Sequence, residues 1–481
     1  MDLRQYQITA IDNLRRGYQS GFRRQLLVSP TGSGKTVIMG EIIRSAIARG
    51  NCVLFVAHRK ELIDQASARL DVVGVPHGVI MSGHERNLPW ERVQVASVQT
   101  LMSRRQRGGA LPLSDFIVID EAHHARAGTY ARILDAYPAA PVLGATATPW
   151  RTDGRGLGEL FEHLVVAARP AELIAQGYLV PYTGFAYDAP DTTKLEHRGS
   201  DYEQKGLALV MSERRIVGNV VQQYLEHAGG VRGLVFAVSI AHSKDLVERF
   251  KAAGVAAEHL DGEMATGDRE AVLARLASGQ TRVVSNVGVL TEGYDCPQIG
   301  CVMLARPTLS LVLFLQMVGR GLRTAEGKSV CLIHDHAGCF MQHGAPDMER
   351  EYALDMDQRS QSKGPLLPPL RTCKKCFAIY PSDAGNICPS CGHVNSSVAQ
   401  KGPTEIDDSS VRAIPLSELP RFKHADEDTR RRHYEKLYSA AVEKGHRPGA
   451  AAMKFKVLYG QWPSASWRKE IEAAAGAQAA R

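Results

Sequence analysis

The stretch that decides the fold is Ser29-Pro30-Thr31-Gly32-Ser33-Gly34-Lys35-Thr36, which lies between an apolar run and a helical stretch. A glycine-rich loop in that position is typical of a phosphate-binding loop, or P-loop. Its backbone amides can turn toward phosphate oxygens, and the following helix adds a favourable dipole. Glycine is usual at the first position, but the small side chain of Ser29 should fit. We predict that Gly32, Ser33, Gly34, Lys35 and Thr36 bind a nucleotide, with Lys35 at the phosphates and the Thr36 hydroxyl on Mg²⁺.

A second apolar run, at residues 116–119, ends in Asp120 and Glu121. Ligands bind at the carboxyl ends of strands in open α/β sheets, so these carboxylates should lie beside the P-loop. Asp120 is expected to hold Mg²⁺ through water, and Glu121 to polarise the attacking water. Without the P-loop, two solvated acids at the start of a helix would explain the pattern equally well.

Short apolar runs alternate with helical stretches up to about residue 340, which predicts two α/β domains with covered parallel sheets. The expected strands are 25–29, 53–57, 93–97, 116–120 and 142–146 in the first series, and 233–238, 257–261, 282–286, 301–305 and 329–334 in the second. The predicted boundaries are 1–175 and 176–345 for the two domains, 346–370 for a linker, 371–396 for a cysteine-rich module and 411–476 for a helical region.

The composition is that of an ordinary globular protein, with 44% hydrophobic and 23% charged residues among 481. It excludes a mostly disordered chain and a fibrous repeat. A net charge of +7 suits a nucleic-acid partner. The N-terminus lacks the apolar segment of a signal peptide, and the segment nearest to a membrane span, 309–318, is too short to be one. We therefore expect a cytoplasmic protein without a membrane partner.

The cysteines predict one metal site. Four of the nine form two C-x-x-C pairs, and the other five are scattered, which does not resemble a disulfide framework. We predict that Cys373, Cys376, Cys388 and Cys391 hold one structural Zn²⁺. A redox dithiol is the alternative, although that chemistry usually uses a single C-x-x-C in a βαβ setting. His334-Asp335-His336 also looks metal-like but is better explained as the end of a strand.

Asp120-Glu121-Ala122-His123 is a D-E-A-H box, and with the P-loop it resembles superfamily II helicases and translocases. Further motifs of that superfamily follow in order between residues 3 and 323. They are Leu3-Arg4-Gln5-Tyr6-Gln7, Val56–Leu62, Ser97–Leu101, Gly144-Ala145-Thr146-Ala147-Thr148-Pro149 (motif III), Asn286–Asp295 (motif V) and Gln316-Met317-Val318-Gly319-Arg320-Gly321-Leu322-Arg323 (motif VI). The resemblance implies two tandem RecA-like motor domains that bind ATP and Mg²⁺.

The resemblance also implies roles for single residues. Gln7 should read the adenine, and Arg320 and Arg323, which follow Gln316 on related helix faces, should bring positive charge to the γ-phosphate from the second domain. Gly293 should offer a backbone amide, and Asp295 should meet the ribose or help to hold the closed cleft. The expected contacts to the nucleic-acid backbone are Arg59, Gln99, Thr100, Ser239 and Thr291.

Finer features resemble the DNA-acting branch that includes UvrB-like and RadD-like proteins. These are Trp150-Arg151-Thr152-Asp153-Gly154 after motif III, a zinc ribbon after the second domain, and a tail with Lys444–Gly449 and Tyr459–Pro463. That likeness implies a role in DNA repair and association with a single-stranded DNA-binding protein.

The leading hypothesis is thus a monomeric, ATP-dependent DNA helicase or translocase acting on single-stranded or forked DNA. One alternative is the motor subunit of a restriction or defence complex whose nuclease is another chain. Another is a DNA-binding adaptor that uses ATP only as a switch. An RNA helicase is a third, against which the residues after motif III argue.

Overall fold

The computed structural model describes residues 3–355, residues 370–395 and a few residues between 427 and 471. Positions left out of the first two ranges are 125–126, 152–153, 188–189, 193–194, 199–200, 212–213, 292, 376, 382–384 and 389–391. Most of the predicted linker (346–370) and of the predicted helical region (411–476) therefore lies outside the described residues. So do Cys376 and Cys391.

The first domain is built on a seven-stranded parallel sheet with strand order β3-β4-β2-β5-β6-β1-β7. Its elements are α1 (Gln5–Gln19), β1 (Arg24–Val28), α2 (Lys35–Ala48), β2 (Val53–Ala57), α3 (Lys60–Val72), β3 (Gly78–Ile80), β4 (Val93–Ser97), α4 (Val98–Gln106), β5 (Phe116–Asp120), η1 (Ala122–His124), α5 (Ala127–Leu134), β6 (Val142–Thr146) and β7 (His163–Val166).

Alternating side chains of the strands enter two different cores. Leu27 packs with α1, α2 and α3 on one face of the first sheet, whereas Leu26 and Val28 pack with α4 and α5 on the other. Both faces are covered, which explains why the strands are apolar throughout.

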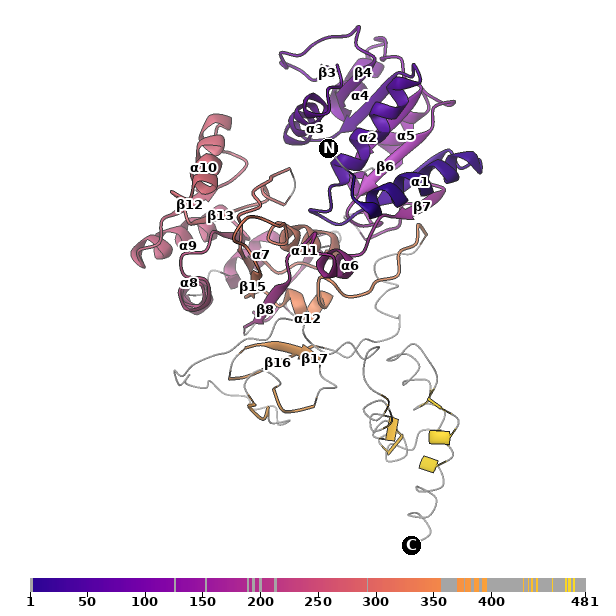
Figure 1. Ribbon diagram of the computed structural model, residues 1–481. Helices are drawn as coiled ribbons and strands as arrows, with labels where there is room; N and C mark the ends of the chain where they lie inside the picture. The colour runs from indigo at the N-terminus through magenta and orange to yellow at the C-terminus, as the bar shows by residue number, and fades with distance from the viewer. Residues whose placement is uncertain are drawn as a thin grey trace.

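The second domain repeats this plan with a six-stranded parallel sheet of order β12-β13-β11-β14-β15-β8. Its elements are α6 (Pro170–Ala175), β8 (Tyr182–Ala186), β9 (His197–Arg198), β10 (Asp201–Tyr202), α7 (Gln204–Met211), α8 (Arg214–Ala228), β11 (Gly233–Ala237), α9 (Ile240–Ala252), β12 (Ala257–Leu260), α10 (Thr266–Ser278), β13 (Val283–Asn286), β14 (Cys301–Ala305), α11 (Leu311–Gly319), β15 (Cys331–Asp335) and α12 (Cys339–His343). The two domains form separate lobes joined near α6 (Figure 1).

The predicted fold class, two parallel α/β domains, is confirmed, and every strand predicted above is present within two residues of its expected limits. Three strands of the two parallel sheets were not predicted. β3 is only three residues long, β7 is a half-buried edge strand that begins with His163, and β8 starts directly after Pro181. The exact domain boundaries stay predictions.

The cysteine-rich module packs against the second domain. Its strands β16 (Leu370–Thr372) and β17 (Ile379–Pro381) pair antiparallel, and Figure 1 shows them beneath β8 and α12. Ala378 bridges to Phe185 of β8, and the Ala186 amide donates to the Phe377 carbonyl at 3.2 Å. β8 is the last strand of its sheet, so the module covers an otherwise open edge.

Within the described residues, no helix combines the length and the apolar character needed to cross a membrane.

Close packing around Gly144 yields a prediction for stability. A methyl group there would lie 2.3 Å from the buried Phe161 ring and 3.0 Å from Leu26. We expect Gly144→Ala to destabilise the first domain by about 1–3 kcal/mol and to lower its melting temperature in scanning calorimetry. The control is Gly128→Ala on α5, where a methyl group meets nothing within 4 Å. Equal melting of Gly144→Ala and the parent would show that this packing does not constrain the fold.

Candidate active site

The P-loop runs from β1 into α2 and depends on left-handed glycines. Gly32 and Gly34 have φ angles of 84° and 80°, which other residues adopt only with strain. Serine at position 29, where glycine is usual, has a structural role. Its Oγ lies 2.6 Å from Ser33 Oγ, and Ser33 Oγ donates to the Pro30 carbonyl at 2.6 Å. Here a serine pair stabilises the turn that begins at the unusual first position.

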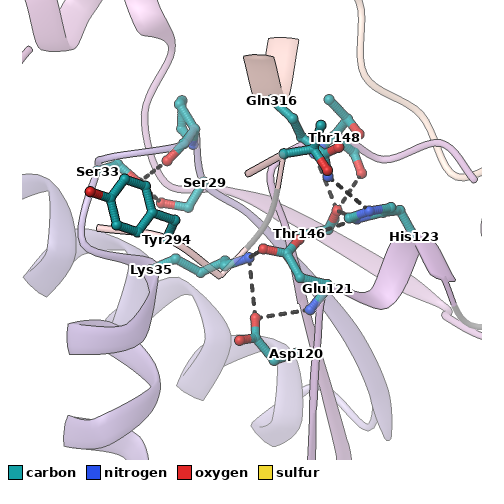
Figure 2. A network of polar contacts seen from close by, with 12 residues as sticks. Ser29, Ser33, Lys35, Asp120, Glu121, His123, Thr146, Thr148, Tyr294 and Gln316 are labelled. Atoms are coloured by element: carbon teal, nitrogen blue, oxygen red, sulfur yellow. Dashed lines mark hydrogen bonds and ion pairs between the residues drawn. The ribbon is translucent and has the colours of Figure 1, made fainter. Parts of the chain in front are cut away.

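Lys35 lies between the two predicted carboxylates, as Figure 2 shows. Its Nζ is 2.5 Å from Glu121 Oε1 and 3.1 Å from Asp120 Oδ1. Lys35 begins the helix that follows β1, and the two carboxylates lie at the end of β5. β6 lies between these two strands, since the order is β5-β6-β1. Burial disfavours the charge on Lys35, but the carboxylates outweigh it and raise the pKa of the ammonium. Glu121 adopts φ 47°, and its amide donates to Asp120 Oδ1 at 2.8 Å.

This donor set fits a divalent cation. Burial raises the pKa of Asp120 and the charge of Glu121 adds to the effect, while Lys35 opposes it. One ammonium thus compensates two nearly buried carboxylates, and Thr36 is the second residue of the adjacent helix α2. Asp120 and Thr36 would hold Mg²⁺, which prefers oxygen ligands and supplies charge neutralisation at phosphates.

A chain of polar contacts leads from Glu121 into the second domain (Figure 2). The Gln316 amide donates to His123 Nε2 at 3.0 Å, so the ring proton must lie on Nδ1. That nitrogen is 3.0 Å from Thr146 Oγ1 and 3.2 Å from Glu121 Oε2. Gln316 was predicted as a site residue, but the linking role of His123 was missed. The sequence did contain a signal for it, because His123 is the histidine of the D-E-A-H box.

The two arginines of motif VI lie differently. Arg320 is buried, and it donates to the carbonyls of Tyr294 at 2.6 Å and Thr291 at 2.7 Å. Arg323 pairs with Asp295 and lies next to the P-loop, since a methyl group on Gly32 would come within 3.0 Å of its Cγ. Arg323 therefore borders the phosphate site directly, whereas motif V holds Arg320. Their catalytic roles stay predictions.

Gln7 lies against the P-loop. Its Nε2 donates to the Ser33 carbonyl at 3.3 Å, and the Tyr6 hydroxyl donates to the same oxygen. Sequence reasoning missed Tyr178, whose ring lies 5.5 Å from that of Tyr6 and beneath the Arg4 guanidinium. The adenine contact of Gln7 stays a prediction.

The predicted nucleic-acid contacts follow the carboxyl ends of four strands. Arg59 comes after β2, Gln99 and Thr100 after β4, Ser239 after β11 and Thr291 after β13. Several already have local partners: Gln99 donates to the His58 carbonyl at 2.9 Å, and Ser239 caps α9 by accepting from the His242 amide at 3.2 Å. Their place along one edge of each sheet suits backbone tracking, but the contacts stay predictions.

In the cysteine-rich module, Cys373 and Cys388 are buried in one small cluster with Ala378 and Tyr380. The Phe377 amide donates to the Cys373 carbonyl at 2.9 Å, and the Gly392 amide donates to the Cys388 carbonyl at 2.9 Å. Phe377 and Gly392 both adopt left-handed backbone, with φ 54° and 69°. The same kind of turn thus begins at the first cysteine of each C-x-x-C pair and is closed by the residue after the pair. Among the described residues, no group of three or more metal ligands is assembled.

Comparison with known proteins identifies the family. Residues 1–151 match the family "Type III restriction enzyme, res subunit" and residues 217–325 match "Helicase conserved C-terminal domain". A "51.5 kDa protein" of Lactococcus phage (isolate 7-9) is 32% identical over 76% of this chain and 77% of its own length. The chain belongs to the superfamily II helicases. It is an enzyme of the helicase-type ATPases.

Other similar proteins are longer than this chain. The "Putative ATP-dependent helicase IRC3" of Saccharomyces cerevisiae is 32% identical over 70% of this chain, which spans 51% of that protein. The fold matches a fragment of a putative HsdR subunit of a type I restriction enzyme from Vibrio vulnificus, with a TM-score of 0.57, 22% identity and coverage of 71% of this chain and 65% of the fragment. The type ISP restriction-modification enzyme LlaBIII bound to DNA matches with a TM-score of 0.54, 20% identity and coverage of 76% and 29%.

Two substitutions should stop ATP turnover by different routes. Lys35→Ala should weaken ATP binding because it removes the ammonium expected at the phosphates. Glu121→Gln should still bind ATP but lower kcat roughly 10²–10⁴-fold, the usual contribution of a general base. Fluorescent-nucleotide binding and phosphate release measure the two effects.

The matched control for the second change is Glu41→Gln, which alters a partly exposed glutamate paired with Arg44 on α2. This variant should hydrolyse ATP normally. Turnover by Glu121→Gln at the parental rate would remove Glu121 from the catalytic step.

Proposed function

We propose that this protein is a nucleic-acid-stimulated ATPase that moves along or unwinds DNA. The observation that carries the proposal is the polar chain from Glu121 through His123 to Gln316, which joins the hydrolytic carboxylate of one domain to motif VI of the other. Hydrolysis in such a site depends on closure of the cleft between the domains. ATP turnover can therefore drive their relative movement.

The chain's own residues would divide the chemistry as follows. Glu121 orients the attacking water and takes its proton, while Lys35 moves from the carboxylates to the phosphates. Arg323, next to Gly32, and Arg320, held by the carbonyls of motif V, supply positive charge from the second domain. Delivering that charge across a cleft can accelerate phosphoryl transfer by roughly 10³–10⁵.

We propose DNA as the track and DNA repair as the setting. The support is the RadD-like pattern of two motor domains, cysteine-rich module and tail, together with the fold match to an enzyme solved bound to DNA. A single-stranded DNA-binding protein is the proposed partner, and a cytoplasmic monomer the proposed state. The backbone contacts predicted at the strand ends require no base reading.

A second candidate is the motor subunit of a restriction complex. Two observations favour it: the first domain matches a restriction-subunit family, and the fold matches two restriction enzymes. In that case another chain would supply the nuclease.

One ATPase panel tests both candidates, using single-stranded DNA, duplex DNA, a fork and RNA, with strand displacement assayed on the active substrates. We expect single-stranded or forked DNA to stimulate turnover. The apparent affinity should fall with salt by roughly 0.7 log units per phosphate contact for each tenfold increase. Stimulation by duplex alone, without strand displacement, would favour the restriction motor. Stimulation by RNA alone would contradict both candidates.

We further propose that the cysteine-rich module binds one structural Zn²⁺ through Cys373, Cys376, Cys388 and Cys391. The structure describes two of these cysteines, Cys373 and Cys388, and both support the proposal. Their side chains lie in one core, and each residue begins a turn that a left-handed residue closes. Zinc would supply folding energy to the module and, with four thiolates, would leave no open position for catalysis.

Metal analysis of the purified protein should therefore find one equivalent of zinc. The double variant Cys388→Ser, Cys391→Ser should lose it, because two oxygen ligands cannot replace two thiolates. Cys52→Ser is the control, since Cys52 is remote from the module in sequence and should not affect zinc. Much less than one equivalent in the parent, or unchanged zinc in the double variant, would rule out the site.

A further inference from the structure

The two motor domains also touch between α3 of the first domain and α10 and motif V of the second. The Arg269 guanidinium of α10 lies 3.4 Å from the Glu61 carboxylate of α3, and the Gln65 amide of α3 donates to the Gly293 carbonyl of motif V. Figure 1 shows α3 and α10 on the facing sides of the two lobes. We call this the α3–α10 contact and define it by Lys60, Glu61, Gln65, Arg269 and Glu270.

The charges of this contact are complementary. The first domain presents Lys60 and Glu61 as neighbours, and the second presents Arg269 and Glu270. The hydrogen bond to Asp64 raises the pKa of Lys60, and the nearby charge of Glu270 adds to that increase, so Lys60 also has an opposite charge across the gap. One ion pair, Arg269–Glu61, and the weaker attraction between Lys60 and Glu270 therefore favour one alignment of α3 and α10.

Arg269 projects from a helix that is fixed at both ends. Before α10 begins, the Asp261 carboxylate accepts from the amides of Glu263 and Met264 at 2.8 and 3.0 Å. Near its end, Arg275 makes a bidentate pair with Glu258 at 2.9 and 2.6 Å. The position of Arg269 is thus set by the second domain as a whole.

The contact also reaches the motif VI arginine. Gly293 lies so close to α3 that a methyl group on it would be 3.2 Å from Glu61 Cβ. Tyr294, the next residue, and Thr291, two residues before Gly293, provide the two carbonyls that hold Arg320. The segment that orients Arg320 is therefore attached on its other side to α3 of the opposite domain.

We propose that Glu61, Gln65 and Arg269 are positioning residues for ATP hydrolysis. They fix motif V against the first domain, and through it the orientation of Arg320, without touching the nucleotide. An exposed ion pair changes an equilibrium constant only roughly two- to fivefold. Such a contact can align the domains in the closed state and still open in every cycle. The catalytic part of this inference rests on the proposed ATPase function.

The test is a charge exchange. Arg269→Glu places three carboxylates together. It should lower kcat roughly two- to fivefold, the change in equilibrium constant expected from one surface ion pair. KM for ATP should be unchanged. Without nucleotide, small-angle X-ray scattering should show a larger radius of gyration. Adding Glu61→Arg should restore both values. Arg249→Glu is the control, because it removes an ion pair within α9 alone and should change neither readout.

The scattering measurement needs no enzymatic activity. If the parent hydrolyses no ATP, the proposed function fails, and scattering still decides whether the α3–α10 contact aligns the domains. The inference is overturned if Arg269→Glu scatters like the parent, if the double variant does not recover, or if KM changes instead of kcat.

Discussion

The rest of the site depends on one buried ammonium between two carboxylates. Lys35 comes from the start of α2, and Asp120 and Glu121 come from the end of β5, two strands away in the sheet. Their combined charge is negative. If a phosphate binds the Lys35 ammonium, the two nearly buried carboxylates lose their counter-charge. Two uncompensated buried charges cost free energy unless another cation binds beside them. The apoprotein is therefore arranged so that a nucleotide and a divalent ion stabilise one another's binding.

The same cluster makes the two domains interdependent. Glu121 contacts His123, and His123 accepts from Gln316, so the second domain contributes to the environment of a carboxylate that it does not carry. A second link involves motif V, whose carbonyls hold Arg320. Motif V is also bound to α3 of the first domain, because Gln65 donates to the Gly293 carbonyl. The second domain thus contacts the first at several places, among them the His123–Gln316 hydrogen bond and the α3–α10 contact.

The sequence predicted the fold well because its strands are short, apolar and separated by clear helical stretches. The P-loop and the acids after β5 were predictable because their chemistry lies in contiguous residues. The linking role of His123 was not, because its partner Gln316 is 193 positions away and only folding joins them. Tyr178 and Gln65 were missed for the same reason. His334 and Asp335, by contrast, end β15 as expected, and Asp335 accepts from the amides of Ala337 and Phe340.

Where the module meets β8, the structure has a consequence for solubility. A bare outer strand of a parallel sheet offers unpaired amides and carbonyls to any passing chain and so promotes aggregation. Here Ala378 and Phe377 bond to part of the edge of β8, and Ile379 packs in the apolar core of the second domain. The module thus covers part of the edge at which the second domain could otherwise pair with another chain.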